Sequence, residues 1–363
     1  MNGGVILETQ ALQKRFTGRK PLFRTAKVVR AVDGINLKVR QGETLAIVGE
    51  SGCGKSTLAR LLVRLMPPSD GTVVYQGRNI ADVPPDQMRA LRRDLQFIFQ
   101  DPFSSLNPRM TIGALVEEPL RVHGIGTPAD RRAQVARMLG RVGLPASVID
   151  RYPHEFSGGQ RQRIGIARAL ITGPKVVIGD EPVSALDVSI QAQVINILQD
   201  LKEELGLTLV IIAHDLAVVR HMADRVAVMY LGEIVEQGPA AELFAAPKHP
   251  YTAALIAAIP VAEVGARTTA PQLQGDPPNP IDLPTGCRFH PRCPHATDIC
   301  RSDRPALSQT GPDRWAACHH ADTLALRGHA GSGHRRDPAV QARFDLYRAA
   351  QMARTTQDRT TTP

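Results

Sequence analysis

GESGCGKST, residues 49–57, places three glycines and a lysine within nine consecutive positions. The stretch before it, ETLAIVG (43–49), is a short apolar run, which predicts a buried strand. The stretch after it, KSTLARLLVRLM (55–66), carries leucines spaced for one face of a helix. A strand, a glycine-rich turn and a helix in this order are what a phosphate-binding turn requires.

The turn matches a phosphate-loop template: a glycine, four residues, a second glycine, a lysine and a serine. Its glycines let consecutive backbone N–H groups point inward around a phosphate, and the helix N-terminus adds its partial positive charge. We expect Lys55 to reach the β- and γ-phosphates of a nucleoside triphosphate, Ser56 to bind Mg²⁺ and Thr57 to contact the α-phosphate. The predicted nucleotide-binding residues of this turn are Gly49, Glu50, Ser51, Gly52, Cys53, Gly54, Lys55, Ser56 and Thr57.

Two acidic residues end a second apolar run, KVVIGDE (175–181). A nucleoside triphosphatase needs a carboxylate at a strand end to hold Mg²⁺ and a group that activates water. We therefore predict Asp180 as a metal-binding carboxylate and Glu181 as the general base. Solvated acids are common at strand ends, so the functional interpretation of this pair depends on the presence of the phosphate loop in the same chain.

Further strands and helices are indicated along the chain. Short apolar runs predict strands, and the stripe in DVSIQAQVINILQDLKEELG predicts a helix that ends at a glycine. Buried strands that alternate with helices imply a largely parallel sheet covered on both faces. The expected elements are strands at 94–100 and 208–215, a helix at 187–206, two strands around a glycine at 225–238 and a small helix at 239–246.

A second glycine turn opens another predicted helix in FSGGQRQRIGIARAL (156–170). With this stretch the chain resembles the ATP-binding subunits of ABC transporters, whose signature motif is SGGQ. In that family the signature closes on the nucleotide held by the partner subunit's phosphate loop. The resemblance thus implies a dimer with two composite ATP sites, to which this chain contributes Ser157, Gly158, Gly159 and Gln160.

The resemblance assigns roles to further positions. Gln100 matches a glutamine that senses Mg²⁺ and water, Asp187 ends the dimer-contact stretch SALD, and His214 matches the histidine that contacts the γ-phosphate. Phe16 resembles the aromatic residue that stacks on adenine, and Phe23 competes for this role. The implied ligands of Mg²⁺ are Ser56, Gln100 and Asp180.

The resemblance also implies a fold class, that of an α/β P-loop ABC ATPase domain. Such a domain combines a mostly parallel core sheet like that of RecA, an antiparallel β subdomain and a helical signature subdomain. We expect it at residues 5–260. A proline-rich linker and a cysteine-containing C-terminal region follow at 261–324, and a basic tail at 325–363.

Longer strings narrow the resemblance to one branch of the family. QDPFSSLNPRMTIG, DEPVSALDVSIQAQVINIL and KHPYTAALIAAIP are similar to the oligopeptide and dipeptide importers, particularly the F-type ATPase subunit. This implies ATP-driven peptide import, although members of that group also import nickel and glutathione. It further implies a second, D-type ATPase, two transmembrane permeases, an extracytoplasmic solute-binding protein and a place on the cytoplasmic face of the membrane.

Charge leaves another function class open. The net charge of +9 and the pI near 9.6 are compatible with a nucleic-acid partner, so a soluble ABC ATPase acting on nucleic acid or ribosomes is an alternative. Such proteins carry two cassettes or a long coiled coil, and neither pattern is present. No run of 18 apolar residues occurs, so we expect no membrane span in this chain.

Four of the five cysteines cluster late in the chain, at Cys287, Cys293, Cys300 and Cys318. In a reducing compartment such a group favours a metal site over disulfides, and four thiolates can hold zinc or an iron–sulfur cluster. The resemblance implies a four-iron, four-sulfur cluster. Zinc, with or without His290, His295 or His319, and free thiols are the alternatives.

Overall fold

The computed structural model describes residues 4–18, 27–101, 103–184, 186–259, 275 and 278–328. The described residues belong to one compact unit, which ends at Gly328. Phe23, most of the proline-rich linker and the tail beyond Gly328 lie outside the described residues. The predictions for those segments stay predictions, as does the division of the chain into three regions.

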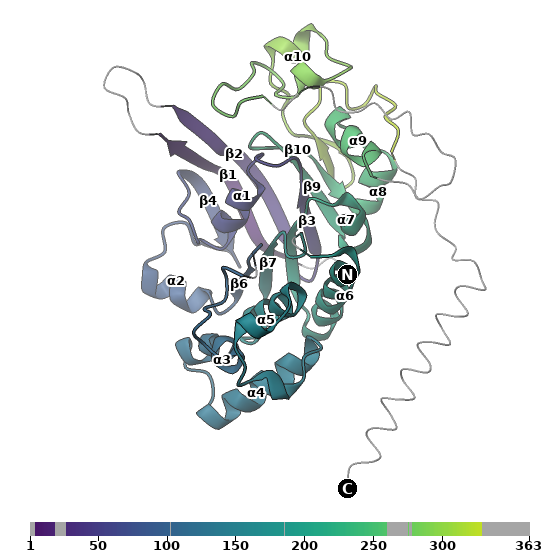
Figure 1. Ribbon diagram of the computed structural model, residues 1–363. Helices are drawn as coiled ribbons and strands as arrows, with labels where there is room; N and C mark the ends of the chain where they lie inside the picture. Colours follow the sequence, from purple (N-terminus) through teal and green to yellow (C-terminus); the bar gives the residue numbers. More distant parts are fainter. Residues whose placement is uncertain are drawn as a thin grey trace, which may run out of the picture. The chain divides into compact units, whose positions relative to one another are not determined.

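Among the described residues, the larger sheet runs in the order β11-β12-β10-β9-β3-β8-β7-β6 (Figure 1). The strands from β9 to β6 in this order pair in parallel, which confirms the predicted parallel core. The strands are β3 (Thr44–Val48), β6 (Leu95–Ile98), β7 (Val176–Asp180), β8 (Thr208–Ile212), β9 (Arg225–Tyr230) and β10 (Glu233–Pro239).

Hydrophobic clusters cover both faces of this sheet. Successive residues of a strand point to opposite faces, so each core strand contributes side chains to both clusters. On β3, Ala46 and Val48 pack into one hydrophobic cluster, while Leu45 and Ile47 pack into the other. The first cluster is closed by the helices after β6 and the second by α1, α2 and the smaller sheet. The helices outside the signature region are α1 (Lys55–Leu62), α2 (Pro85–Leu91), α6 (Val188–Leu205), α7 (Leu216–Met222), α8 (Ala240–Ala245) and α9 (Pro250–Ala257).

The smaller sheet is antiparallel and has the strand order β2-β1-β4-β5 in the described part of the chain. Figure 1 shows β1 and β2 as a long ribbon that extends beyond the rest of this sheet. The strands are β1 (Val5–Thr17), β2 (Val28–Arg40), β4 (Asp70–Tyr75) and β5 (Arg78–Asn79). The sheet is the antiparallel subdomain that the family resemblance implied.

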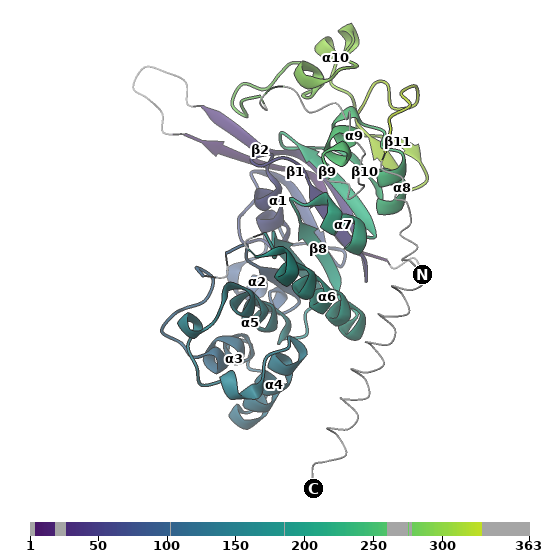
Figure 2. The same cartoon turned by 45° about the vertical axis from the view of Figure 1, so that its right-hand side comes forward.

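A helical region lies between β6 and β7 in sequence and consists of α3 (Ile112–Val122), α4 (Pro128–Arg141) and α5 (Gly158–Leu170), with short 3-10 turns at Ala146–Val148 and Pro153–Glu155. The capping box between Thr127 and Asp130 fixes the start of α4. In both views this region lies at the opposite end of the unit from α10 (Asp298–Ser302) (Figures 1 and 2). It is the predicted helical subdomain that carries the signature stretch.

The cysteine-containing region is joined to the core sheet. Its strands β11 (Ser308–Gly311) and β12 (Arg314–Ala316) form a hairpin, and β12 pairs with β10, with Glu236 opposite Ala316 and Gln237 opposite Trp315. A 3-10 turn at His290–Arg292 precedes α10. Figure 2 shows the hairpin beside α8 and α9. The C-terminal region therefore continues the main sheet.

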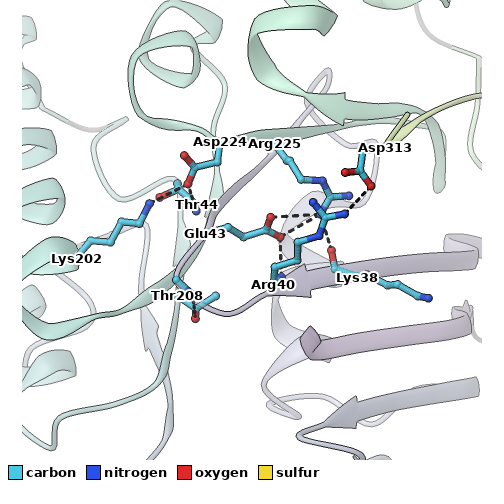
Figure 3. Close-up of polar contacts among 10 residues, drawn as sticks. Lys38, Arg40, Glu43, Thr44, Lys202, Thr208, Asp224, Arg225 and Asp313 are labelled. Atoms are coloured by element: carbon cyan, nitrogen blue, oxygen red, sulfur yellow. Dashed lines mark hydrogen bonds and ion pairs between the residues drawn. The ribbon is translucent and has the colours of Figure 1, made fainter. Parts of the chain in front are cut away.

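A polar network ties the amino ends of the core strands together (Figure 3). Glu43 accepts hydrogen bonds from the backbone of Arg40 at 2.8 Å and from the guanidinium of Arg225 at 3.1 Å. Arg40 in turn donates to Asp313, beside β12, at 2.6 Å. Burial raises the pKa of Glu43, while Arg40 and Arg225 oppose that rise. The network holds β2, β3, β9 and the C-terminal hairpin at one end of the sheet.

Candidate functional site

The predicted site residues gather at the opposite end of the same strands. The phosphate loop follows β3, Gln100 follows β6, Glu181 follows Asp180 at the end of β7, and His214 follows β8. The carboxyl ends of parallel strands meet at one edge of a sheet, where α/β proteins bind ligands. The fold thus brings together residues that lie far apart in the sequence.

Close backbone contacts explain two of the glycines in the loop. A Cβ on Gly49 would stand 2.1 Å from the carbonyl oxygen of Met229, and one on Gly54 would stand 2.0 Å from that of Ala31. Gly54 also has a φ of 108°, in the left-handed region that favours glycine, and it caps α1. The loop is therefore held between β2 and β9 with its backbone exposed toward the helix start.

Lys55 lies folded into this loop. Its side chain is buried, and Nζ donates to the carbonyl oxygens of Gly49 at 2.7 Å and Glu50 at 2.9 Å. The ammonium group of Lys55 adds its charge to the partial positive charge of the helix N-terminus. Such a place favours an anionic ligand.

The two predicted metal-binding groups are in direct contact. Ser56 Oγ donates to Asp180 Oδ1 at 2.8 Å, and Asp180 is 1% exposed. Burial raises the pKa of Asp180, and the Ser56 hydrogen bond and Arg60 oppose this rise. A partly buried hydroxyl at the helix start and a buried carboxylate at the end of β7 are oxygen ligands of the kind that Mg²⁺ prefers.

Glu181 and Gln100 also lie together, with Gln100 Nε2 donating to Glu181 Oε2 at 2.9 Å. Glu181 has a φ of 47°, which is uncommon for a residue with a side chain and occurs at active sites. A cavity of about 330 Å³ lies beside it, and His214 and Ser184 are among the residues that line it. The structure therefore brings a carboxylate, an amide and an imidazole to one edge of the sheet, and their catalytic roles stay predictions.

The signature residues form the start of α5. Ser157 Oγ accepts from the backbone of Gln160, while Gln160 Oε1 accepts from the backbone of Ser157, so each caps the other. A Cβ on Gly159 would stand 2.5 Å from Ile190 Cγ2 of α6. The nearest atoms to the two signature glycines belong to Ile190, Leu186 and Phe103, and not to the phosphate loop. Asp187 is exposed at the start of α6.

Phe16 lies near the outer end of β1, where it pairs with Val29 of β2, and its side chain is 40% exposed. Ala31 lies two residues after Val29 on β2, and its carbonyl oxygen lies against Gly54 of the phosphate loop. Phe16 thus pairs with a part of β2 that lies two residues from the contact with the phosphate loop. Its role in contacting a base stays a prediction.

Sequence reasoning missed the partners of Glu50. Both oxygens of this carboxylate accept from Arg292, at 2.7 Å and 2.9 Å, and the backbone N–H of Glu50 donates to Tyr251 Oη at 2.8 Å. No local pattern marks these residues, because Arg292 lies 242 positions from Glu50. A charged residue within the loop was the one available signal that a partner must exist.

The four late cysteines line one small cavity, together with histidines that include His290, His295 and His319. The space enclosed is about 10 Å³, roughly what one water molecule occupies. Among the described residues, no three His, Cys, Asp or Glu side chains have the arrangement of a metal site. Burial raises the pKa of Cys287, Cys293 and Cys318 to about 11, which disfavours thiolates. The described residues therefore do not show a metal centre, and the iron–sulfur cluster and zinc stay predictions.

Comparison with known proteins agrees with the geometry. A family model for "ABC transporter" matches residues 32–184, and one for "Oligopeptide/dipeptide transporter, C-terminal region" matches residues 235–300. A solved dimeric ATP-binding cassette with ADP and phosphate is similar at 30% identity and a TM-score of 0.58, covering 65% of this chain and 99% of that one. Fold and site together define an ATP-hydrolysing ATP-binding cassette.

Two curated relatives place the chain within this class. It is 48% identical to the oligopeptide transport ATP-binding protein AppF of Bacillus subtilis, over 88% of this chain and 98% of that protein. It is 52% identical to the oligopeptide transport ATP-binding protein OppF of Escherichia coli, over 84% and 92% respectively. The chain belongs to this family of ABC transporter ATP-binding proteins. No helix in the described part is long and apolar enough to cross a membrane.

Proposed function

We propose that this chain hydrolyses ATP to power the import of oligopeptides or dipeptides through a membrane complex. The observation that carries the proposal is the meeting of the phosphate loop, the Ser56–Asp180 pair and the Gln100–Glu181 pair at one edge of the sheet. The similarity to transport ATP-binding proteins over most of their length supports peptides as the cargo.

In this proposal each group at the edge has one task. Lys55 and the loop backbone hold the phosphates of ATP, and Glu181 takes a proton from the attacking water. Ser56, Asp180 and Gln100 would hold Mg²⁺, which neutralises charge on the phosphates when bound. His214 contacts the terminal phosphate, and Phe16 stacks on adenine. Catalysis then arises from placement and charge neutralisation.

The site is completed by a second ATPase. The signature turn at Ser157–Gln160 lies in the helical region, and its nearest neighbours are not in the phosphate loop of the same chain. We propose that it meets the nucleotide of the partner and that Asp187 lies at the contact. The solved cassette with ADP and phosphate is itself a dimer, which supports this arrangement. Similarity to F-type subunits favours a different, D-type chain as the partner.

The remaining partners are two transmembrane permeases and an extracytoplasmic solute-binding protein, with this chain on the cytoplasmic face of the inner membrane. Purification of the tagged chain from detergent-solubilised membranes, followed by mass spectrometry, tests this assembly. We expect two permeases and a second ATPase to co-purify, with stimulation of ATP turnover by a peptide-loaded binding protein. Stimulation by nickel or glutathione alone would contradict the cargo. Recovery with ribosomes or nucleic acid would contradict import.

A second candidate function concerns the cysteine cavity. Its four sulfurs come from Cys287, Cys293, Cys300 and Cys318 and share one buried space, and thiolates suit iron and zinc. We propose that these residues would hold an iron–sulfur cluster, with zinc as the alternative, and that the centre stabilises the C-terminal region.

Measurement of iron, acid-labile sulfide and zinc per chain in anaerobically purified protein tests this candidate. The cluster predicts about four irons and four sulfides per chain. Zinc without sulfide would select the alternative. Absence of both metals would contradict a metal centre and leave free thiols.

A further inference from the structure

The C-terminal region contacts the phosphate loop through a partly buried ion pair. Arg292 donates from Nη1 to Glu50 Oε2 at 2.7 Å and from Nη2 to Glu50 Oε1 at 2.9 Å. The side chain of Arg292 is 5% exposed and that of Glu50 is 25% exposed. Two parallel, charge-assisted bonds fix the position of a carboxylate as well as its charge. Glu50 is therefore held from outside the loop to which it belongs.

Aromatic side chains pack around the turn that carries Arg292. Phe289 is 1% exposed and packs edge-on against Tyr230 and at an angle against Tyr251, with ring centroids 5.4 Å away in both cases. Tyr251 Oη accepts the backbone N–H of Glu50 at 2.8 Å. The turn that carries Arg292 is thus packed on residues that also bind the loop backbone.

A second arginine of the C-terminal region supports the loop from another side. Arg288 is buried, pairs with Asp33 and Glu233, and donates to the carbonyl oxygen of Leu231. The next residue, Gly232, donates its N–H to the carbonyl oxygen of Cys53 at 2.9 Å. Two separate routes therefore lead from the C-terminal region to the phosphate loop.

The charge of Glu50 is the reason why Arg292 matters for nucleotide binding. The backbone oxygen of Glu50 holds Lys55 Nζ at 2.9 Å, so this residue is part of the cradle for the phosphates. An unpaired carboxylate there would repel a triphosphate and compete for the ammonium group of Lys55. Arg292 neutralises this carboxylate and turns it toward the C-terminal region.

We propose that Arg292 is a positioning residue for ATP binding: it neutralises and orients Glu50, and through it the C-terminal region sets the affinity of the phosphate loop. The inference rests on the proposed ATP site. It gives the C-terminal region a task in the nucleotide cycle. It also links that task to the cysteine cavity, because Arg292 directly precedes Cys293 and follows Phe289 in the same turn.

Calorimetric titration of the full chain with ATP and excess Mg²⁺ tests the proposal. Arg292→Gln is expected to weaken ATP binding by about tenfold or more, since it leaves the carboxylate of Glu50 unneutralised beside the triphosphate. Arg292→Lys keeps the charge and should bind ATP more tightly than Arg292→Gln. Thermal unfolding of each variant shows whether it is folded.

The double variant Glu50→Gln/Arg292→Gln distinguishes positioning from a merely structural role. It removes the repelling charge together with its partner, so it should recover affinity relative to Arg292→Gln. Arg40→Gln is the matched control, because Arg40 pairs with Asp313 of the C-terminal region far from the loop. It should bind ATP as the wild type does.

Unchanged affinity in Arg292→Gln would overturn the proposal, as would a double variant that binds no better than the single one. If Arg292→Gln does not fold, Arg292→Lys carries the test: it should bind ATP less tightly than the wild type, because an ammonium group cannot make both bonds to Glu50, and equal affinity would overturn the proposal. Failure of the wild-type chain to bind ATP would instead contradict the proposed function. The two claims therefore fail in different ways.

Discussion

The two ends of the core strands are built differently, although the same strands run through both. At the amino end, Glu43 is nearly buried and is held by the backbone of Arg40 and by the guanidinium of Arg225. At the carboxyl end, Glu181 has an uncommon backbone conformation and is bonded by the exposed side chain of Gln100. Glu43 is thus enclosed at one end of the strands, while Glu181 and its partner Gln100 lie at an accessible edge at the other.

This contrast separates stability from activity. Buried carboxylates with several donors resist rearrangement, whereas groups at a ligand edge must exchange partners when a nucleotide binds. Arg292 combines both features: its side chain is buried, as that of Glu43 at the amino end is, but its partner Glu50 lies in the phosphate loop at the carboxyl end. We therefore expect changes at the amino end to alter unfolding and changes at the carboxyl end to alter ATP binding or turnover.

The largest expected effect is on stability, from Arg225→Met. This change leaves Glu43 buried without its guanidinium partner, and breaking a buried ion pair costs about 3–5 kcal/mol. Urea denaturation should show this loss in the free energy of unfolding, while turnover per folded molecule stays the same.

Lys202→Gln is the control for that change, because Lys202 pairs with the exposed Asp224 at the same end of the sheet (Figure 3). Its expected cost is below about 1 kcal/mol. Equal costs for the two variants would break the distinction between enclosed and exposed pairs.

A smaller effect is expected for Gly54→Ala, this time on nucleotide binding. The new Cβ meets the carbonyl oxygen of Ala31 at 2.0 Å, so the loop must shift, and backbone strain costs about 1–3 kcal/mol. ATP affinity should fall by about tenfold. Gly34 has a φ of 80° and open space around it, so Gly34→Ala should cost about 1–2 kcal/mol of stability and spare ATP affinity. An equal loss of ATP affinity in both variants would show that the contact with Ala31 is not the cause of the loss at Gly54.

The smallest effect concerns the pH dependence of Arg40→Gln. The Arg40 guanidinium lowers the pKa of Asp313 below its ordinary value of 3.8. The pair therefore stabilises the fold above pH 3.8 and loses this contribution as the pH falls through the lowered value. Because Asp313 is exposed, the contribution is below about 1 kcal/mol. In unfolding measurements, the wild-type advantage over Arg40→Gln should be largest at pH 6 and should shrink as the pH is lowered below 3.8. An advantage that does not shrink as the pH falls would contradict the assignment.

Much of the core was predictable from the sequence. The apolar runs before the phosphate loop and before Asp180 became β3 and β7, and the stripe at 187–206 became α6 at Val188–Leu205. These elements are encoded by local hydrophobic patterns, which a short window detects. The phosphate loop could likewise be predicted, since phosphate binding requires glycine, lysine and serine at a fixed spacing in the sequence.

Long-range contacts were not predictable. The hairpin β11–β12 has strands of four and three residues, too short for a clear alternation, and its partner β10 lies far back in the chain. The pairing of Arg292 with Glu50 depends on that same folding back. Likewise, the grouping of the four cysteines predicted a shared metal site but gave no measure of the space between them, which depends on how Phe289 and the surrounding histidines pack.

The central claim is that the carboxyl edge hydrolyses ATP with Glu181 as the base. The most direct measurement compares ATP turnover and ATP affinity of Glu181→Gln with those of the wild type. Turnover should fall by about 10²–10⁴-fold, the contribution of a general base, while affinity and thermal stability stay close to wild type. Retained turnover in a folded Glu181→Gln protein that still binds ATP would contradict the claim.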